Sequence, residues 1–174
     1  MGDRCWVNAR IGGHIASREA FDRLLGQIND DGGEPMHSEN MRTEFLSAID
    51  HPTNLEFSFF GVNDGALRCL EDLCSELDLY YQADNGEGEH YTAACKAIVP
   101  KNSSCKYAGH RFHYPASEAE PMLSAAAIRR HLDAGTLTEE LRRMDIAGGS
   151  ELPPISAAVE VVAYLRINPK AEAA

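Results

Sequence analysis

The sequence predicts an α+β fold: a mixed or mainly antiparallel sheet of four to five strands, helices mainly on one face and a helical C-terminal part. Short stretches of alternating apolar and polar residues indicate the strands, and apolar residues at helical spacing indicate the helices. The chain of 174 residues is 44% hydrophobic, enough to bury a core without a disulfide or a metal. We expect a single domain over residues 1–168, with a strand-rich core at 1–115 and a helical part at 116–168, and a frayed tail at 169–174.

The first third of the chain reads as strand, helix and helix. Residues 4–11 alternate between apolar and polar side chains, and Gly12-Gly13 interrupts this strand. Ser17 is a suitable N-cap for a helix with one apolar face, formed by Phe21, Leu24, Leu25 and Ile28. Residues 29–37 are rich in Asp and Gly and predict a loop, after which a second helix follows Ser38.

The middle third predicts the remaining strands. Residues 55–59 alternate, and the glycines at 61 and 65 turn the chain into a helix with an apolar face from Leu67 to Leu77. Two strands near 79–82 and 90–99 are joined by Asp84-Asn85-Gly86-Glu87-Gly88, a strong hairpin signal. A fifth strand is expected at 105–114, stopped by Pro115.

The C-terminal part has the spacing of helices. Residues 124–134 predict a helix that ends at Gly135, and Thr136 with Glu139 forms a capping-box pattern for the next one. In residues 155–167 the apolar spacing is helical, but the valines leave a strand open as an alternative.

Charge and cysteine content restrict the function. The formal net charge of −11 makes direct binding to nucleic acid unfavourable, because phosphate backbones repel an acidic protein. The five cysteines are odd in number, and four lie in apolar patterns, which predicts free thiols in a reducing compartment. We see no secretory signal and no apolar run of about 20 residues, so we expect a cytoplasmic protein without a membrane segment.

Candidate sites for chemistry are weak. Gly12-Gly13 and the 61–65 turn have the backbone freedom to hold an anion, but match no nucleotide fingerprint. Cys95, Cys105, His110 and His113 are of the residue types that bind zinc, but their spacing is poor, so we expect no metal and no cofactor. The alternative function is therefore a small enzyme or anion-binding domain near the glycine turns and the 105–114 strand. Its polar groups would be His14, Asn63, Asp64, His110 and His113.

Charge segregation is the most informative feature. Residues 71–89 contain seven carboxylates and no Lys or Arg, whereas residues 90–116 contain four basic residues and no carboxylate. Pairing between neighbouring segments inside the fold would explain this pattern. An acidic surface that engages a protein partner with a basic surface would also explain it. An inhibitor or accessory protein of a nucleic-acid-binding protein would need such a surface.

We therefore predict a non-enzymatic, acidic protein-binding module that uses the 80–91 hairpin. Carboxylates at the tip of a hairpin lack internal partners and steer a basic protein towards the surface, and tyrosines anchor it. No catalytic residue is assigned. The expected contact residues are Asp84, Glu87, Glu89, Tyr80, Tyr81 and Tyr91.

Overall fold

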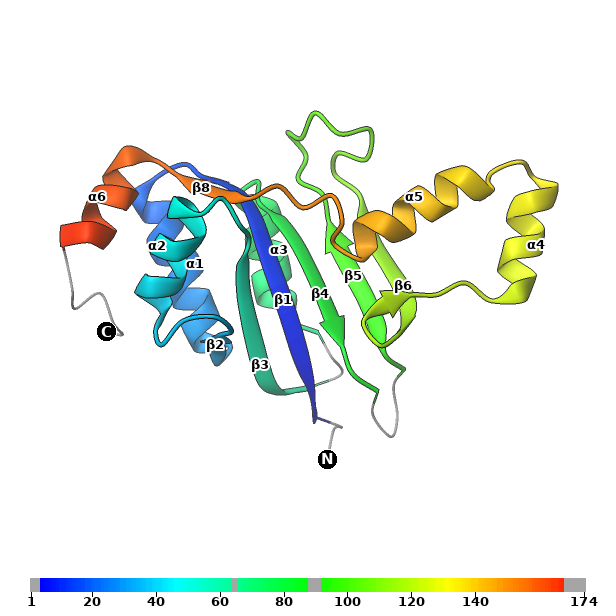
Figure 1. Ribbon diagram of the computed structural model, residues 1–174, viewed down its shortest axis with the longest axis horizontal. Helices are drawn as coiled ribbons and strands as arrows, with labels where there is room; N and C mark the ends of the chain where they lie inside the picture. The colour runs from blue at the N-terminus through cyan, green and yellow to red at the C-terminus, as the bar shows by residue number, and fades with distance from the viewer. Residues whose placement is uncertain (1–3, 64–65, 88–91, 168–174) are drawn as a thin grey trace.

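The computed structural model describes residues 4–63, 66–87 and 92–167 and has one extended sheet with helices on both faces (Figure 1). Along the sheet the strand order is β2-β3-β1-β4-β5-β6-β7, with antiparallel neighbours, and β8 pairs in parallel with the end of β1. The strands are β1 (Arg4–Ile15), β2 (Gly33–Pro35), β3 (Leu55–Asn63), β4 (Tyr80–Asn85), β5 (Ala94–Ile98), β6 (Arg111–Ser117), β7 (Glu120–Pro121) and β8 (Ile155–Ala157). The helices are α1 (Arg18–Asp30), α2 (Met41–Asp50), α3 (Arg68–Glu76), α4 (Ala125–Asp133), α5 (Leu137–Ala147) and α6 (Val159–Ile167).

The α+β class and the antiparallel sheet are confirmed, but the strand number is wrong. The five predicted strands correspond to β1, β3, β4, β5 and β6. The other three, β2, β7 and β8, are only two or three residues long. Two or three residues are too few to show an alternating pattern. These strands are instead defined by their pairing, β2 with β3, β7 with the end of β6, and β8 with β1.

The main core lies between β1, β3, β4 and the helices behind them. Alternate residues of β1 point into it, as do Phe21, Leu24 and Ile28 of α1. Ser17 caps α1 as predicted, because its side chain accepts a hydrogen bond from the backbone of Ala20. Helices α2, α3 and α6 add buried side chains to the same cluster.

A second, smaller cluster covers the opposite face of the sheet. There Cys95 and Ala97 of β5 and Phe112 of β6 meet Ile146 and Ala147 of α5. The helical part at 116–168 therefore contributes to two clusters rather than to one. Helix α5 lies on one face, whereas α6 packs on the other through Val161 and Leu165.

Several local predictions need correction. Gly12 and Gly13 do not end the first strand, which continues to Ile15 because β8 pairs with its last three residues. Residues 105–110 form turns rather than a strand, and β6 begins at Arg111. Thr136 precedes α5 without a capping hydrogen bond, since its hydroxyl contacts His131 instead. The undecided segment 155–167 begins as strand β8 and continues as helix α6.

Candidate functional site

The residues of the predicted acidic hairpin do not share one surface. Tyr81 is fully buried in the main core, because it lies on the inward phase of β4. Tyr80 points to the other side, and its hydroxyl bonds to Ser103. Asp84 belongs to β4 rather than to the turn and is only partly exposed. Glu87 is exposed, and Glu89 and Tyr91 lie outside the described residues.

Most of the acidic stretch has partners within the fold. Glu71 and Asp72 of α3 form ion pairs with Lys96 and Arg111. Glu76 pairs with Arg23 of α1 at 2.8 Å. The carboxylate of Asp78 accepts a hydrogen bond from the backbone of Asn102. Internal pairing therefore explains much of the charge segregation seen in the sequence.

The groups of the enzyme alternative do not converge. Asn63 is paired with Arg4 at the start of β1, whereas His14 lies near the other end of this strand. At the usual rise per residue of a β-strand, the two positions are about 30 Å apart. His14 contacts Ser156, and His113 projects from β6, three strands away from β1. His110 is exposed and bonds to the carbonyl of Tyr107, while Asp64 lies outside the described residues.

All five cysteines are free thiols, and three of the five are buried. Cys5, Cys74 and Cys95 are buried, Cys69 is exposed on α3, and Cys105 is intermediate. The thiol of Cys95 donates to the carbonyl of Ala119. Among the residues that the structure describes, no group of three or more His, Cys, Asp or Glu side chains is arranged to hold a metal ion.

A different surface combines polar and aromatic side chains: the sheet face that carries the outward residues of β1, β3 and β4. We call it the outward face. Its first row of side chains is the aromatic pair Trp6 and Phe60, which are 63% and 47% exposed. Their rings meet edge to face, with centroids 4.6 Å apart. Exposed aromatics in contact with each other are a common mark of a binding surface.

The second row of the outward face is polar. Asn8 is opposite Ser58 on one side and Asp84 on the other. The side-chain nitrogen of Asn8 donates a hydrogen bond to the Asp84 carboxylate at 3.3 Å. Its side-chain oxygen accepts one from the Ser58 hydroxyl at 3.0 Å. Glu34 of β2 lies opposite Ser58 and extends the row. The carboxylate of Asp84 is partly buried and therefore poorly solvated, which raises its pKa. An added positive charge would stabilise the ionised carboxylate.

The third row closes the outward face at one end. Arg10 lies between Glu56 and Gln82 in the register and forms an ion pair with Glu56 at 3.6 Å. His37 also contacts Glu56, at 2.9 Å. Gly149 covers Arg10 and Gln82 so closely that an added Cβ would lie 3.4 Å from both side chains. The open part of the face is therefore the first two rows.

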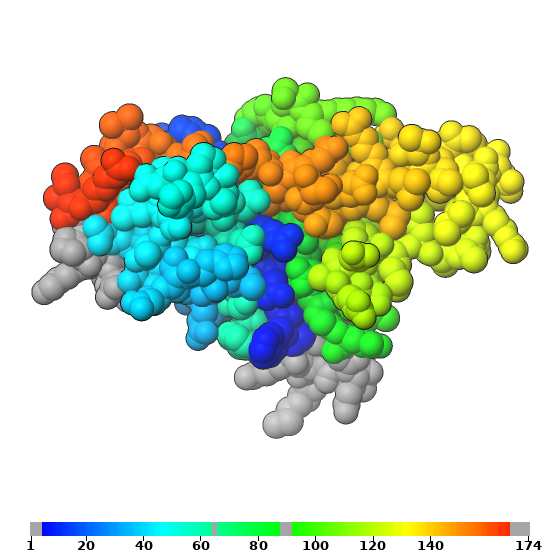
Figure 2. Space-filling model, viewed as in Figure 1, coloured from blue at the N-terminus to red at the C-terminus, as the bar shows by residue number. Residues whose placement is uncertain are grey.

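Two walls make this face a groove. Figure 2 shows β1 at the bottom of a hollow, between the segment around β2 and the turn from β6 to β7. The turn is held over the sheet by the bond from Cys95 to Ala119, and Glu118 and Ala119 adopt positive φ angles of 52° and 65°. The turn places Glu118 and Glu120, both exposed, at the rim next to the row that contains Asp84.

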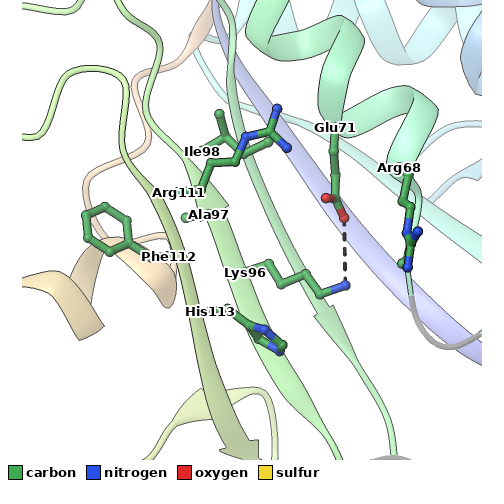
Figure 3. Close-up of a pocket in the computed structure, with 9 residues that line it drawn as sticks. Arg68, Glu71, Lys96, Ala97, Ile98, Arg111, Phe112 and His113 are labelled. Carbon is green, nitrogen blue, oxygen red and sulfur yellow. Dashed lines mark ion pairs between the residues drawn. The ribbon is translucent and has the colours of Figure 1, made fainter.

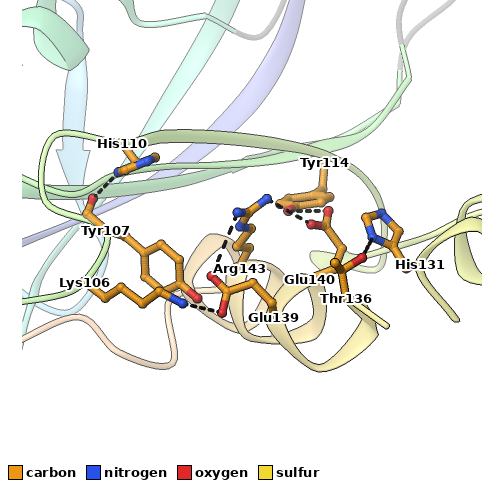
Figure 4. Close-up of polar contacts among 9 residues, drawn as sticks. All are labelled: Lys106, Tyr107, His110, Tyr114, His131, Thr136, Glu139, Glu140 and Arg143. Atoms are coloured by element: carbon orange, nitrogen blue, oxygen red, sulfur yellow. Dashed lines mark hydrogen bonds and ion pairs between the residues drawn. The ribbon is translucent and has the colours of Figure 1, made fainter. Parts of the chain in front are cut away.

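Helix α5 is fastened beside the groove by a polar cluster (Figure 4). The Tyr114 hydroxyl of β6 donates to the buried carboxylate of Glu140 at 2.8 Å. Arg143 pairs with Glu140 at 3.3 Å, and Lys106 pairs with Glu139 at 2.7 Å. Burial, followed by the bond to Glu140, raises the pKa of Tyr114, so the hydroxyl stays protonated and remains a donor. These contacts join Tyr114 of β6 and Lys106 of the preceding turn to α5, so they hold the helix against the sheet.

Sequence reasoning did not find the outward face. Its signal was present in residues 4–11, where Trp6 shares the phase of the polar residues Asn8 and Arg10. An aromatic residue in the polar phase of a strand points away from the core. Only the register of β1 with β3 shows that Phe60 lies next to it.

Comparisons with protein-family models, with curated proteins and with solved structures give no match. None of the helices in the described part of the chain has both the length and the hydropathy needed to cross a bilayer. The function must therefore be inferred from the surface itself.

Proposed function

We propose that the protein is a non-enzymatic binding module whose outward face holds a basic segment of a protein partner. The observation that carries the proposal is the half-buried Asp84, which lies in the row of the outward face that follows the exposed pair Trp6 and Phe60. This retains the acidic binding module predicted from the sequence but moves the contact from the 80–91 hairpin to the sheet face. A nucleic-acid-binding protein is one class of partner with such basic segments, and a cytoplasmic location remains part of the proposal.

The chemistry of the face suits a lysine or arginine side chain. The aromatic rings attract a cation through their π faces, an interaction worth about 0.5–2 kcal/mol. Asp84, in the next row of the face, would accept a charge-assisted hydrogen bond from the charged end. The described residues give Asp84 an amide partner, Asn8, but no ion pair. An incoming cation would therefore fill an interaction that the folded chain leaves open.

The charge of the groove points the same way. Among the side chains that the structure describes, three carboxylates, Glu34, Glu56 and Asp84, share the outward face with one permanent cation, Arg10. The rim adds Glu118 and Glu120. A basic segment would be drawn to this face by long-range attraction and selected by it, whereas an acidic segment would be repelled.

The unique tryptophan makes the test direct. Trp6 is the only tryptophan of the chain, so its fluorescence reports binding at the proposed site. Titration with an oligo-arginine peptide at moderate salt should shift Trp6 emission and saturate. Asp84→Asn should weaken the affinity by about tenfold or more, because a hydrogen bond to a charged group contributes about 1.5–3 kcal/mol.

The matched control is Asp133→Asn, which removes the same charge from an exposed position on α4. We expect this change to alter the affinity by less than about twofold, since it affects only the screened long-range field. Equal weakening by the two variants would mean that the peptide binds through net charge alone, and the proposed site would be rejected. Absence of any change in Trp6 fluorescence on saturation would also reject it.

A further inference from the structure

A cavity on the opposite face of the sheet has a different character. It lies where β5 and β6 extend beyond α3, and its volume is about 400 Å³ (Figure 3). Lys96 and Ile98 of β5 are opposite His113 and Arg111 of β6, so the four side chains form the floor. The wall is α3, and the groove of the proposed function lies on the opposite face of the same sheet, over β1, β3 and β4.

The α3 wall brings a further cation into the cavity. Figure 3 shows Arg68 and Glu71 descending from α3, while Lys96 reaches across from β5 towards Glu71. The Lys96 and Glu71 charges are 3.7 Å apart, and Arg111 is paired with Asp72 at 2.7 Å. Among the described residues, nothing forms a hydrogen bond or an ion pair with Arg68 or His113.

The local charge is the reverse of the molecule's charge. Among the side chains that the structure describes around the cavity, Arg68, Lys96 and Arg111 outnumber the two carboxylates Glu71 and Asp72. The chain as a whole carries −11. At physiological ionic strength the repulsion by distant carboxylates is screened over about 8 Å, so the cations that line the cavity determine what enters it.

From these charges and this shape we infer that the cavity binds a small organic phosphate monoester. Arg68 and His113 would donate hydrogen bonds to the phosphate oxygens, together with the positive field of Lys96 and Arg111. A volume of about 400 Å³ exceeds the need of inorganic phosphate and falls in the range of small-molecule sites. Ile98 offers an apolar surface for the organic group, and the Glu71 carboxylate can accept a hydrogen bond from its hydroxyl groups.

Adenosine monophosphate is a suitable probe, with adenosine as its uncharged counterpart and inorganic phosphate as the smaller anion. Isothermal titration calorimetry should show saturable binding of the monophosphate and no saturable binding of adenosine. Inorganic phosphate should bind at least about tenfold more weakly, because it makes no contact with Ile98. Arg68→Gln should weaken monophosphate binding by about tenfold or more.

The control is Arg129→Gln, which removes one exposed arginine from α4, away from the cavity. It should leave the affinity for the monophosphate within about twofold of the parent protein. The inference is overturned if the monophosphate does not bind, or if adenosine or inorganic phosphate binds equally well. It is also overturned if both arginine variants lose affinity equally. Because oligo-arginine binding at Trp6 is measured separately on the opposite face, failure here leaves the proposed function standing.

Discussion

Tyr81 carries a phenol hydroxyl in the middle of the main core, where none of the described residues forms a hydrogen bond with it. Burial raises the pKa of this phenol well above its ordinary value, so the group is neutral at all moderate pH values. A buried hydroxyl without a partner costs desolvation energy. We expect Tyr81→Phe to leave the free energy of unfolding unchanged or to raise it by up to about 1 kcal/mol in urea denaturation.

The comparison for Tyr81 is Tyr81→Ala, which removes the whole ring from a fully buried site. Loss of a buried aromatic ring costs about 3–5 kcal/mol, so the ring and the hydroxyl can be judged separately. A loss of more than about 1 kcal/mol in Tyr81→Phe would mean that the hydroxyl has a hydrogen-bonding partner after all.

Asp84 gives the protein a pH dependence of a particular sign. Because burial raises the pKa of Asp84, the folded state binds its proton more tightly than the unfolded chain, whose aspartate has a pKa of about 3.9. Stability from this group therefore falls as pH rises through the folded-state pKa. Asp84→Asn should be more stable than the parent protein near pH 7, and the difference should vanish by about pH 3.

Urea denaturation of Asp84→Asn at both pH values checks this expectation. It also establishes that the variant used in the binding test is folded. If Asp84→Asn is less stable than the parent protein near pH 7, the hydrogen bond from Asn8 to the carboxylate outweighs its desolvation.

Two helices of this fold have the same cap but different amounts of buried surface. Ser17 caps α1 and Ser124 caps α4, each by accepting a hydrogen bond from a backbone amide at 3.2 Å. Helix α1 buries Phe21, Leu24 and Ile28, whereas α4 buries only Ala127. Ser17→Ala should therefore lower the free energy of global unfolding by about 0.5–2 kcal/mol.

Ser124→Ala should instead leave the global urea midpoint unchanged and speed hydrogen exchange within α4. A helix with little buried surface opens locally without the rest of the molecule, so loss of its cap affects only that local equilibrium. Each variant serves as the control for the other. Equal effects on the global midpoint would mean that α4 is coupled to the main core more strongly than its burial indicates.

Long periodic elements were predictable from the sequence, and short or paired ones were not. The alternation in β1 and the apolar face of α1 follow from local spacing, and both are confirmed. Local spacing predicts that Gly12 interrupts the strand, but it lies within β1, where an added Cβ would come within 2.0 Å of the Pro153 carbonyl. A side chain is excluded at this position because Pro153, about 140 positions further along the chain, packs against it. No local sequence pattern reveals this contact.

The same limit explains the candidate site. The hairpin signal at 84–88 placed Asp84 in a turn, although the strand continues through Asn85 because β1 pairs with it on the other side. The outward phase of Trp6 was visible in the sequence. Its contact with Phe60 and the walls of the groove were not, because they depend on the order of the strands.

At the scale of the whole molecule, one sheet carries two separate hydrophobic clusters. The larger cluster joins β1, β3 and β4 to α1, α2, α3 and α6, and the smaller joins β5 and β6 to α5. Strand β4 contributes to the first and pairs with β5, which contributes Ile98 to the first and Cys95 and Ala97 to the second. A continuous ladder of backbone hydrogen bonds between the two clusters favours cooperative unfolding, which is the single-domain prediction made from the sequence.

Two buried cysteines allow that prediction to be tested, since each cluster contains one. Cys74 lies in the larger cluster and Cys95 in the smaller, and both side chains are fully buried. Burial raises the pKa of both thiols, that of Cys95 to about 11, so neither reacts with an alkylating reagent until its cluster opens. Brief alkylation at increasing urea concentrations, read by mass spectrometry of the labelled peptides, should give the same midpoint for both, while exposed Cys69 reacts without urea. A lower midpoint for Cys95 would show that the part around α5 unfolds on its own, and the single-domain prediction would then be wrong.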